Sequence, residues 1–508
     1  MDLKLIARNI STQWLVIGAQ LVISIAMTPF LVRRLGDEGY GIIALISGIV
    51  GYHGILYFGL GAAVVKYVAE YHARGDTEAL DQTVSTIFVI YLAIGTLWLA
   101  LSLALLAPLP WLFNLRPAQI GDARAMLLMM GFALFVHFPG SVYGGVVMGL
   151  ERFDVLNRYN FGLLLVRNLA TYLAVLRYPS VVVVGLINMV TLLAEPVVAA
   201  VFARRLLPAL KISLRGFSRA RARQLFTFST QSFLFTLSEK LINYTDEFVI
   251  SQARGPGAVT HYVIPLRLVD YARDGIDKAT LVLMPGISAT AARGDLTTLK
   301  NVWRFGNKAV MCLVAPVCLV FLAWGHHVLT LWLDRSYADR GYPVLLWLAL
   351  AFVVQVAGRG IARPIFEGLG ELRTPARITV LEGLTNLVIS VILVRTELGV
   401  AGVAMATFIP AAISGVFVMP FFVCRRLGVH YGLHLVRTFV RTAPPLVPAY
   451  GVLVLAEGWG FHRHFFSLAA TCFTVLVVYL AFAALVTFDD EERAMLRARM
   501  RRAQTLAP

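Results

Sequence analysis

Long apolar runs alternate along the chain with short polar connections. Four of these runs, at 12–32, 84–109, 400–424 and 465–488, contain no charged residue. Each is long enough to cross about 30 Å of hydrocarbon as an α-helix. Four such runs exclude a soluble protein, and the first is longer than the apolar core of a signal peptide. The pattern therefore predicts an all-α, polytopic membrane protein.

Weaker apolar segments bring the predicted number of transmembrane helices to about fourteen. The composition agrees, because 58% of the residues are hydrophobic and only 15% are charged, which is typical of a chain whose solvent is the bilayer. The weaker segments are 42–65, 125–150, 159–176, 181–203, 225–251, 259–289, 309–331, 344–366, 378–394 and 442–456.

The net charge of +16 follows a topological pattern. Most Lys and Arg residues fall in loops after even-numbered helices, which places both termini in the cytoplasm of a bacterial inner membrane by the positive-inside rule. We expect this charge to contact anionic lipid headgroups, and we expect no nucleic-acid partner. The densest basic stretch, between predicted helices 6 and 7, contains Arg204, Arg205, Lys211, Arg215, Arg219, Arg221 and Arg223.

An internal repeat divides the chain. Ala73-Arg74-Gly75-Asp76 recurs as Ala292-Arg293-Gly294-Asp295, and Gly36 falls on Gly255 at the same offset. An even number of helices per half gives both halves one orientation, as in transporters with parallel repeats. We predict two six-helix lobes, a further helix pair and a basic cytoplasmic tail, with boundaries at 1–211, 212–430, 431–488 and 489–508.

Charged residues inside predicted helices are the candidate functional residues, since an ionisable group in the bilayer core is costly unless it lines water or has a partner. The cations exceed their nearby acids, which predicts a positively charged cavity for an anionic substrate such as a phosphate. A second interpretation is that they form ion pairs near the headgroups, such as Asp274 with Lys278. The candidate substrate-binding residues are Lys240, Arg267, Arg273, Arg359, Arg363 and Arg167.

Acidic residues in the same helices are candidates for coupling to protons or sodium ions, or for structural ion pairs. Those considered are Asp246, Asp270, Asp274 and Glu195. Glu382 is a further intramembrane carboxylate, for which a capped or snorkelling position is the alternative.

Enzymatic signatures are missing from the sequence. There is no GxxxxGK[ST] phosphate loop, GxSxG elbow or HExxH motif, so we expect no enzymatic activity and no cofactor. The four cysteines lie in apolar stretches without metal-site spacing, and we predict no metal site.

Several short motifs occur in a fixed order along the chain: Thr28-Pro29, Arg34-Leu35-Gly36, Glu38-Gly39-Tyr40-Gly41, Gly59-Leu60, Lys66-Tyr67, Glu70, Asp246, Tyr262 and Leu266-Arg267-Leu268. Together they resemble bacterial polysaccharide flippases of the Wzx type, in the multidrug/oligosaccharidyl-lipid/polysaccharide exporter superfamily. One departure is Tyr57, which stands where many relatives have an acidic residue.

The resemblance implies a flippase that moves an undecaprenyl-diphosphate-linked oligosaccharide from the cytoplasmic to the periplasmic leaflet, for O-antigen, capsule or exopolysaccharide assembly. It also implies partners in the polysaccharide polymerase and chain-length machinery. Alternatives within the superfamily are a lipid II flippase and a cation-coupled multidrug exporter. A membrane ligase or polymerase acting on the same lipid carrier is a further alternative, but its expected large periplasmic loop is absent from the predicted topology.

Overall fold

The computed structural model describes residues 3–57, 60–281, 287, 290–291, 293–371, 373–489 and 492–493. Within these ranges, the side chains of 3–15, 17, 228–244, 277–281 and 367 are not described. Every regular element in the described residues is helical, which confirms the predicted all-α class. Contacts divide the chain into two compact units, Met1–Thr260 and His261–Pro508. The boundary predicted at 211–212 separates the two copies of the sequence repeat, whereas the contacts separate compact units. The predicted boundary therefore stays a prediction.

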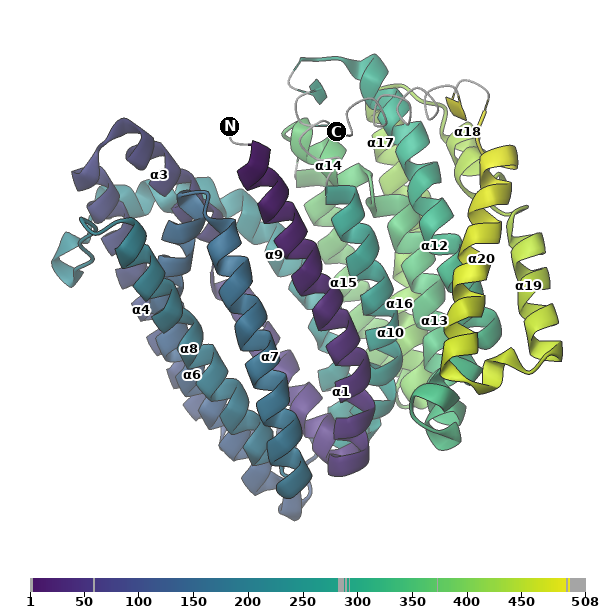
Figure 1. The fold of residues 1–508 in the computed structure, drawn as a ribbon, viewed down its shortest axis with the longest axis horizontal. Helices are drawn as coiled ribbons and strands as arrows, with labels where there is room; N and C mark the ends of the chain where they lie inside the picture. The colour runs from purple at the N-terminus through teal and green to yellow at the C-terminus, as the bar shows by residue number, and fades with distance from the viewer. Residues whose placement is uncertain are drawn as a thin grey trace. The chain divides into compact units, whose positions relative to one another are not determined.

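Unit 1 is built around three long helices. In Figure 1, α6 packs between α4 and α8, with α7 beside α8. Its core contains fully buried side chains such as Leu45, Leu134 and Phe138. The elements are α1 (Leu3–Gly51), α2 (His53–Leu56), α3 (Leu60–Arg74), α4 (Thr77–Leu105), α5 (Leu109–Leu112), α6 (Pro117–Gly149), α7 (Phe153–Arg177), α8 (Val181–Leu206), η1 (Leu214–Gly216), α9 (Arg219–Arg254) and the start of α10 (Pro256–Leu281).

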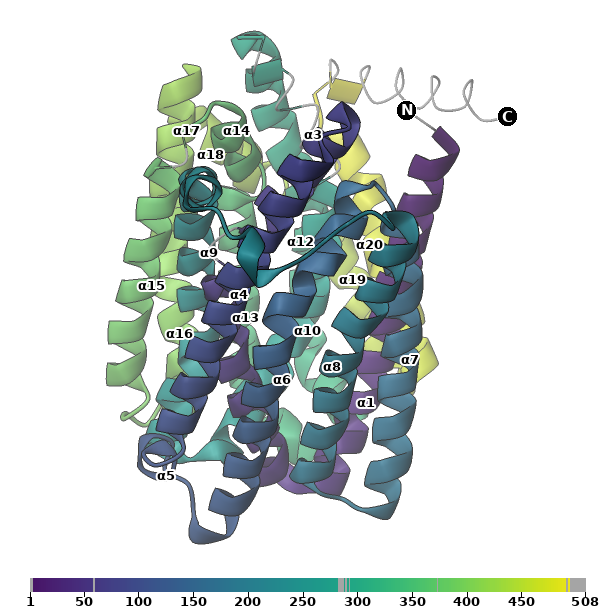
Figure 2. The same cartoon turned by 90° about the vertical axis from the view of Figure 1, so that its left-hand side faces the viewer.

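Unit 2 contains the rest of α10 and the helices that follow. Here α13 packs between α12 and α16, and α15 lies beside α16 (Figure 2). The elements are α12 (Leu296–Trp332), α13 (Arg335–Arg359), α14 (Ala362–Gly368), α15 (Arg373–Leu393), α16 (Gly399–Ala412), the π-helix η2 (Ile413–Val418), α17 (Met419–Leu427), α18 (Tyr431–Leu435), the π-helix η3 (Val436–Val440), α19 (Leu446–Gly458), η4 (Phe461–Arg463) and α20 (Phe465–Val486).

The helices confirm a multi-pass membrane protein. Ten in the described part of the chain are long and apolar enough to span a bilayer, with α1 and α2 counted as one. Gly36 divides α1 into two helices, since its φ of 71° and ψ of 176° are not helical. Predicted helices 7 and 8 coincide with α9 and α10, whose charged residues set them apart from apolar spans. Predicted helix 2 is interrupted after Leu56.

The backbone reproduces the sequence repeat. Gly36 and Gly255, the first matched pair, both have positive φ, at 71° and 83°. Gly75 and Gly294, the second pair, have φ of 70° and 68°. Glycine adopts this left-handed region without the steric cost that a Cβ imposes. The sequence therefore repeats glycine where the fold repeats a turn.

The residues that follow the second pair repeat a helix cap. Asp76 and Asp295 are the N-cap residues of α4 and α12, and each carboxylate accepts a hydrogen bond from the backbone N–H three residues later, at 2.9 and 3.0 Å. A third pair at this offset is Glu151 and Gly370, with φ of 58° and 72°. Their side chains differ, so this match is visible only in the backbone.

The segment between α8 and α9 is hydrogen-bonded to side chains of α4. The backbone N–H groups of Lys211, Ser213 and Ser218 donate to side chains of α4 at 3.0, 3.1 and 3.1 Å. These hydrogen bonds stabilise the connection and place the start of α9 beside α4. The loop is thus an ordered part of that unit.

Candidate functional site

A close helix crossing in unit 2 organises the candidate site. A Cβ at Gly358, near the end of α13, would collide with the backbone of Gly415 in η2, and one at Gly415 would collide with the backbone of Val354. Only glycine lets two backbones approach this closely. The crossing brings Arg359, which follows Gly358, next to Ser414, which precedes Gly415.

These neighbours, Arg359 and Ser414, both bind Glu382 of α15. The guanidinium of Arg359 forms an ion pair with the Glu382 carboxylate, and the Ser414 hydroxyl donates to the same carboxylate. The side chain of Glu382 is 3% exposed and that of Arg359 is 24% exposed. Arg359 therefore has an acidic partner that is distant in sequence, because Glu382 lies beside it in the fold.

A second cation, Arg273 of α10, contacts α13 at Gln355, one helical turn before Arg359. Its guanidinium donates to the side-chain oxygen of Gln355 at 3.1 Å and lies 3.7 Å from the Asp270 carboxylate. It also lies over the ring of Phe352, 5.8 Å from the centroid. The guanidinium side chain is 26% exposed, so part of it remains accessible to a ligand.

The other predicted residues of these helices are exposed or have side chains that the structure does not describe. Arg267 and Arg363 have exposed side chains, on α10 and α14, and Asp274 is exposed on α10. Lys240 lies in α9 among the side chains that the structure does not describe, as does Lys278 of the proposed Asp274–Lys278 pair. The structure thus brings together Arg273, Asp270 and Arg359 through α13.

Unit 1 has a similar crossing with different chemistry. A Cβ at Gly140 of α6 would collide with Pro196 of α8. Beside this crossing, Nδ1 of His137 lies 4.0 Å from the Glu195 carboxylate and 3.3 Å from a backbone carbonyl of α8. The carboxylate beside the crossing stands on α8 here, whereas Glu382 of unit 2 stands on α15.

The remaining candidates of unit 1 lie apart from one another. Arg167 of α7 is half-buried, and no described acidic side chain forms an ion pair with it. Tyr57 packs its ring against Phe138 and Tyr91, with centroids 4.9 and 5.2 Å apart. An aromatic cluster thus occupies the position where the resemblance would have placed an acid.

Asp246 lies on the part of α9 that packs against α1 and α2 and is 4% exposed. The hydroxyl of its neighbour Thr245 lies 3.2 Å from the hydroxyl of Tyr52. Asp246 is therefore part of a buried helix interface rather than of an exposed surface.

Sequence reasoning missed two uncharged residues of this cluster, Gln355, which accepts from Arg273, and Ser414, which donates to Glu382. Gln355 and Ser414 carry no charge, and such residues are frequent in transmembrane helices, so no pattern singles them out. The spacing of Gln355 and Arg359, one helical turn apart, was the available signal.

Two family models match large parts of this chain. One, described as "Polysaccharide biosynthesis protein", matches residues 6–291. The chain belongs to this polysaccharide biosynthesis protein family. The other, described as "Lipid II flippase MurJ", matches residues 169–470. These two matches, with the relatives below, confirm the resemblance to Wzx-type polysaccharide flippases.

Curated relatives of this family member cover most of its length. An "Uncharacterized membrane protein EpsK" of Bacillus subtilis (strain 168) is 24% identical over 94% of this chain and 95% of its own. A "Putative O-antigen transporter" of Shigella flexneri is 21% identical over 65% of this chain and 77% of its own.

Solved structures agree on the fold. An inward-facing multidrug resistance MATE family transporter of the MOP superfamily has a TM-score of 0.67 and 17% identity, over 80% of this chain and 94% of its own. A MOP superfamily transporter from Pyrococcus furiosus, whose structure is titled "Reverse polarity of binding pocket suggests different function", has a TM-score of 0.58 and 17% identity, over 84% and 96%. The family member therefore has the fold of these transporters.

Proposed function

We propose that this protein flips an undecaprenyl-diphosphate-linked oligosaccharide from the cytoplasmic to the periplasmic leaflet of a bacterial inner membrane. The observation that carries the proposal is the pair of partly exposed guanidinium groups, Arg273 and Arg359, that α13 brings together in unit 2. A guanidinium binds phosphate oxygens through two parallel hydrogen bonds, which suits a diphosphate headgroup. Arg267, Arg363, Lys240 and Arg167 are further cations for the same substrate.

The membership in a polysaccharide biosynthesis family supports a lipid-linked sugar precursor as the substrate class. The curated O-antigen transporter relative supports the same class. We propose O-antigen, capsule or exopolysaccharide assembly as the process, with both termini in the cytoplasm. The polymerase and chain-length proteins that use the flipped product are the proposed partners.

Coupling to an ion gradient is proposed for unit 1. Glu195 and His137 lie 4.0 Å apart beside the α6–α8 crossing, and a carboxylate beside an imidazole can hold a proton or a small cation. Alternating access would then link ion release from unit 1 to substrate movement.

A lipid II flippase is the second candidate function, favoured by the match of the MurJ family model to residues 169–470. Lipid II also carries a diphosphate, so the arginines suit both substrates. A multidrug exporter is less well supported, because its cationic substrates would be repelled by a cationic site.

Lipid analysis of a strain lacking the gene separates these functions. Accumulation of an undecaprenyl-diphosphate oligosaccharide on the cytoplasmic leaflet, with loss of surface polysaccharide, is the expected result. Accumulation of lipid II would establish the second candidate. An unchanged lipid distribution with increased drug sensitivity would refute both and indicate an exporter.

A further inference from the structure

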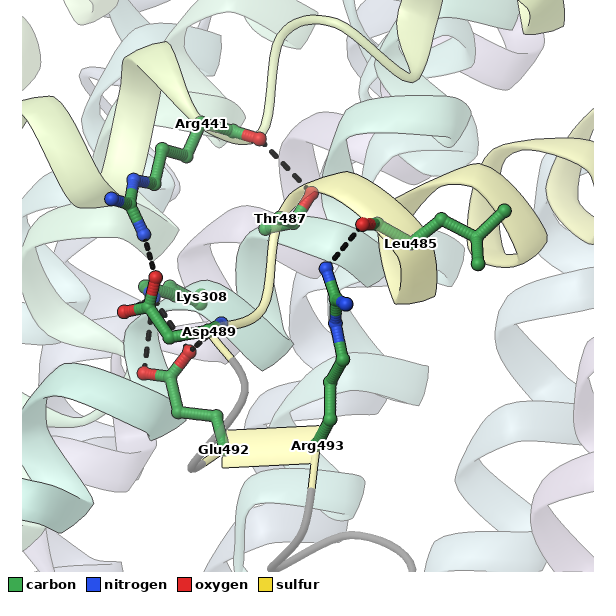
Figure 3. Close-up of polar contacts among 7 residues, drawn as sticks. All are labelled: Lys308, Arg441, Leu485, Thr487, Asp489, Glu492 and Arg493. Carbon is green, nitrogen blue, oxygen red and sulfur yellow. Dashed lines mark hydrogen bonds and ion pairs between the residues drawn. The ribbon is translucent and has the colours of Figure 1, made fainter.

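Lys308 of α12 is a fully buried lysine, with 0% of its side chain exposed. Its ammonium group donates to both carboxylate oxygens of Glu492, at 2.7 and 3.0 Å, and lies 3.6 Å from the carboxylate of Asp489 (Figure 3). A buried ammonium group is costly unless acidic partners compensate it. Among the described residues, both acidic partners of Lys308 come from the turn after α20.

The same turn is also bonded to the segment before α19. The guanidinium of Arg441 forms an ion pair with Asp489, and the hydroxyl of Thr487 donates to the Arg441 carbonyl at 2.9 Å (Figure 3). Burial would by itself raise the pKa of Asp489, but the hydrogen bond from Arg441 and the charge of Lys308 outweigh it and lower that pKa. Asp489 is thus held ionised between two cations.

An apolar seam continues from these charges along the helices. Phe488 packs against Phe305 of α12 with ring centroids 5.5 Å apart, and Tyr479 of α20 donates to the Thr442 carbonyl at 2.7 Å. The cluster formed by α12, α19 and α20 also buries Cys312. The ion pairs of Lys308 and Arg441 lie at one end of this seam, just after the end of α20.

We propose that Asp489 and Glu492, which follow α20, form a clasp that fastens the appended helix pair α19–α20 to α12 by neutralising Lys308. The pair therefore moves with the helices of unit 2 rather than as a separate gate. This inference concerns residues outside the substrate site and does not depend on the proposed substrate.

The decisive experiment separates loss of the clasp from loss of acidic residues in general. In the double variant Asp489→Asn/Glu492→Gln, Lys308 becomes a buried charge that has lost both of its acidic partners among the described residues. We expect the melting temperature of the purified protein to fall by at least about 5 °C. Hydrogen exchange in α19 and α20 should accelerate, while exchange in unit 1 stays unchanged.

Replacing the lysine should reverse this effect. The triple variant Lys308→Met/Asp489→Asn/Glu492→Gln has an apolar side chain of similar length and no buried charge, so we expect both the melting temperature and the slow exchange to return. Glu397→Gln, at an exposed position, is the control and should change neither. Unchanged exchange in the double variant, or a double variant that Lys308→Met fails to rescue, would overturn the clasp.

Discussion

Arg359 of α13 and Glu382 of α15 form an ion pair between two helices, 23 residues apart in sequence. This pairing changes what a substitution at Arg359 tests. Removing the guanidinium removes a cation from the proposed substrate site, but it also leaves a buried carboxylate without its cationic partner. Loss of transport in a single variant would not separate these effects.

A paired substitution does separate them. We expect Arg359→Gln alone to cost about 3–5 kcal/mol of unfolding free energy, because the carboxylate of Glu382 stays buried. Arg359→Gln/Glu382→Gln should recover most of this stability without recovering flipping. The measurements are thermal unfolding and flipping in reconstituted vesicles. A stable double variant with full activity would exclude Arg359 from substrate binding.

Arg273 provides a test with less effect on stability, since its acidic neighbour Asp270 is partly exposed. We expect Arg273→Gln to lower the flipping rate at least about tenfold, the equivalent of one lost charge-assisted hydrogen bond. Arg395→Gln, on an exposed turn, is the matched control. Full activity after replacement of both Arg267 and Arg273 would contradict the cationic substrate site.

Glu195 should affect coupling rather than substrate affinity. With Glu195→Gln, we expect flipping driven by an imposed proton or sodium gradient to fall to its rate without a gradient. The dependence of the rate on substrate concentration should be preserved. Vesicles with controlled inner and outer solutions provide the measurement. A variant that still responds to both gradients would place coupling elsewhere.

Gly358 tests the helix crossing. Gly358→Ala would place a methyl group against the backbone of Gly415, and we expect it to destabilise the protein by about 1–3 kcal/mol. Gly162→Ala is the control, because a Cβ at Gly162 meets open space and alanine favours a helix. Equal melting temperatures for the two variants would show that the crossing is looser than described.

His434 should make stability depend on pH. It is buried against Trp303, with ring centroids 4.7 Å apart, and burial lowers its pKa from 6.5 to about 4. Below about pH 6.5 the unfolded chain binds a proton that the folded chain does not, so stability is complete above that pH and declines as the pH falls toward 4. His434→Phe should make the melting temperature less dependent on pH in this range. His72→Gln, at an exposed position, should leave this dependence unchanged.

The sequence predicted the features that repeat or that follow from local chemistry. Gly75 and Asp76 recur as Gly294 and Asp295 because a left-handed turn needs glycine and a helix N-terminus favours aspartate. The apolar runs predicted the membrane helices because polar and charged side chains are costly in the hydrocarbon core of a bilayer. The equivalence of Glu151 with Gly370 was missed, because two different side chains adopt one backbone conformation there.

Partners across helices could not be predicted in the same way. Nothing in the sequence joins Lys308 to Glu492 or Arg359 to Glu382, since each pair depends on which helix faces come together in the fold. A single sequence gives the periodicity of each helix but not its rotation against its neighbours. The predicted cations therefore stay candidates, and only the fold shows which acidic side chain lies beside Arg359.

The clasp has a consequence for the order in which the protein is made. Lys308 and Glu492 are separated by 184 residues, so ribosomes complete α12 long before they add Asp489 and Glu492. A newly inserted α12 thus keeps its lysine without these acids while several further helices are synthesised. Assembly of unit 2 is consequently a late event, completed after most of its helices have already entered the membrane.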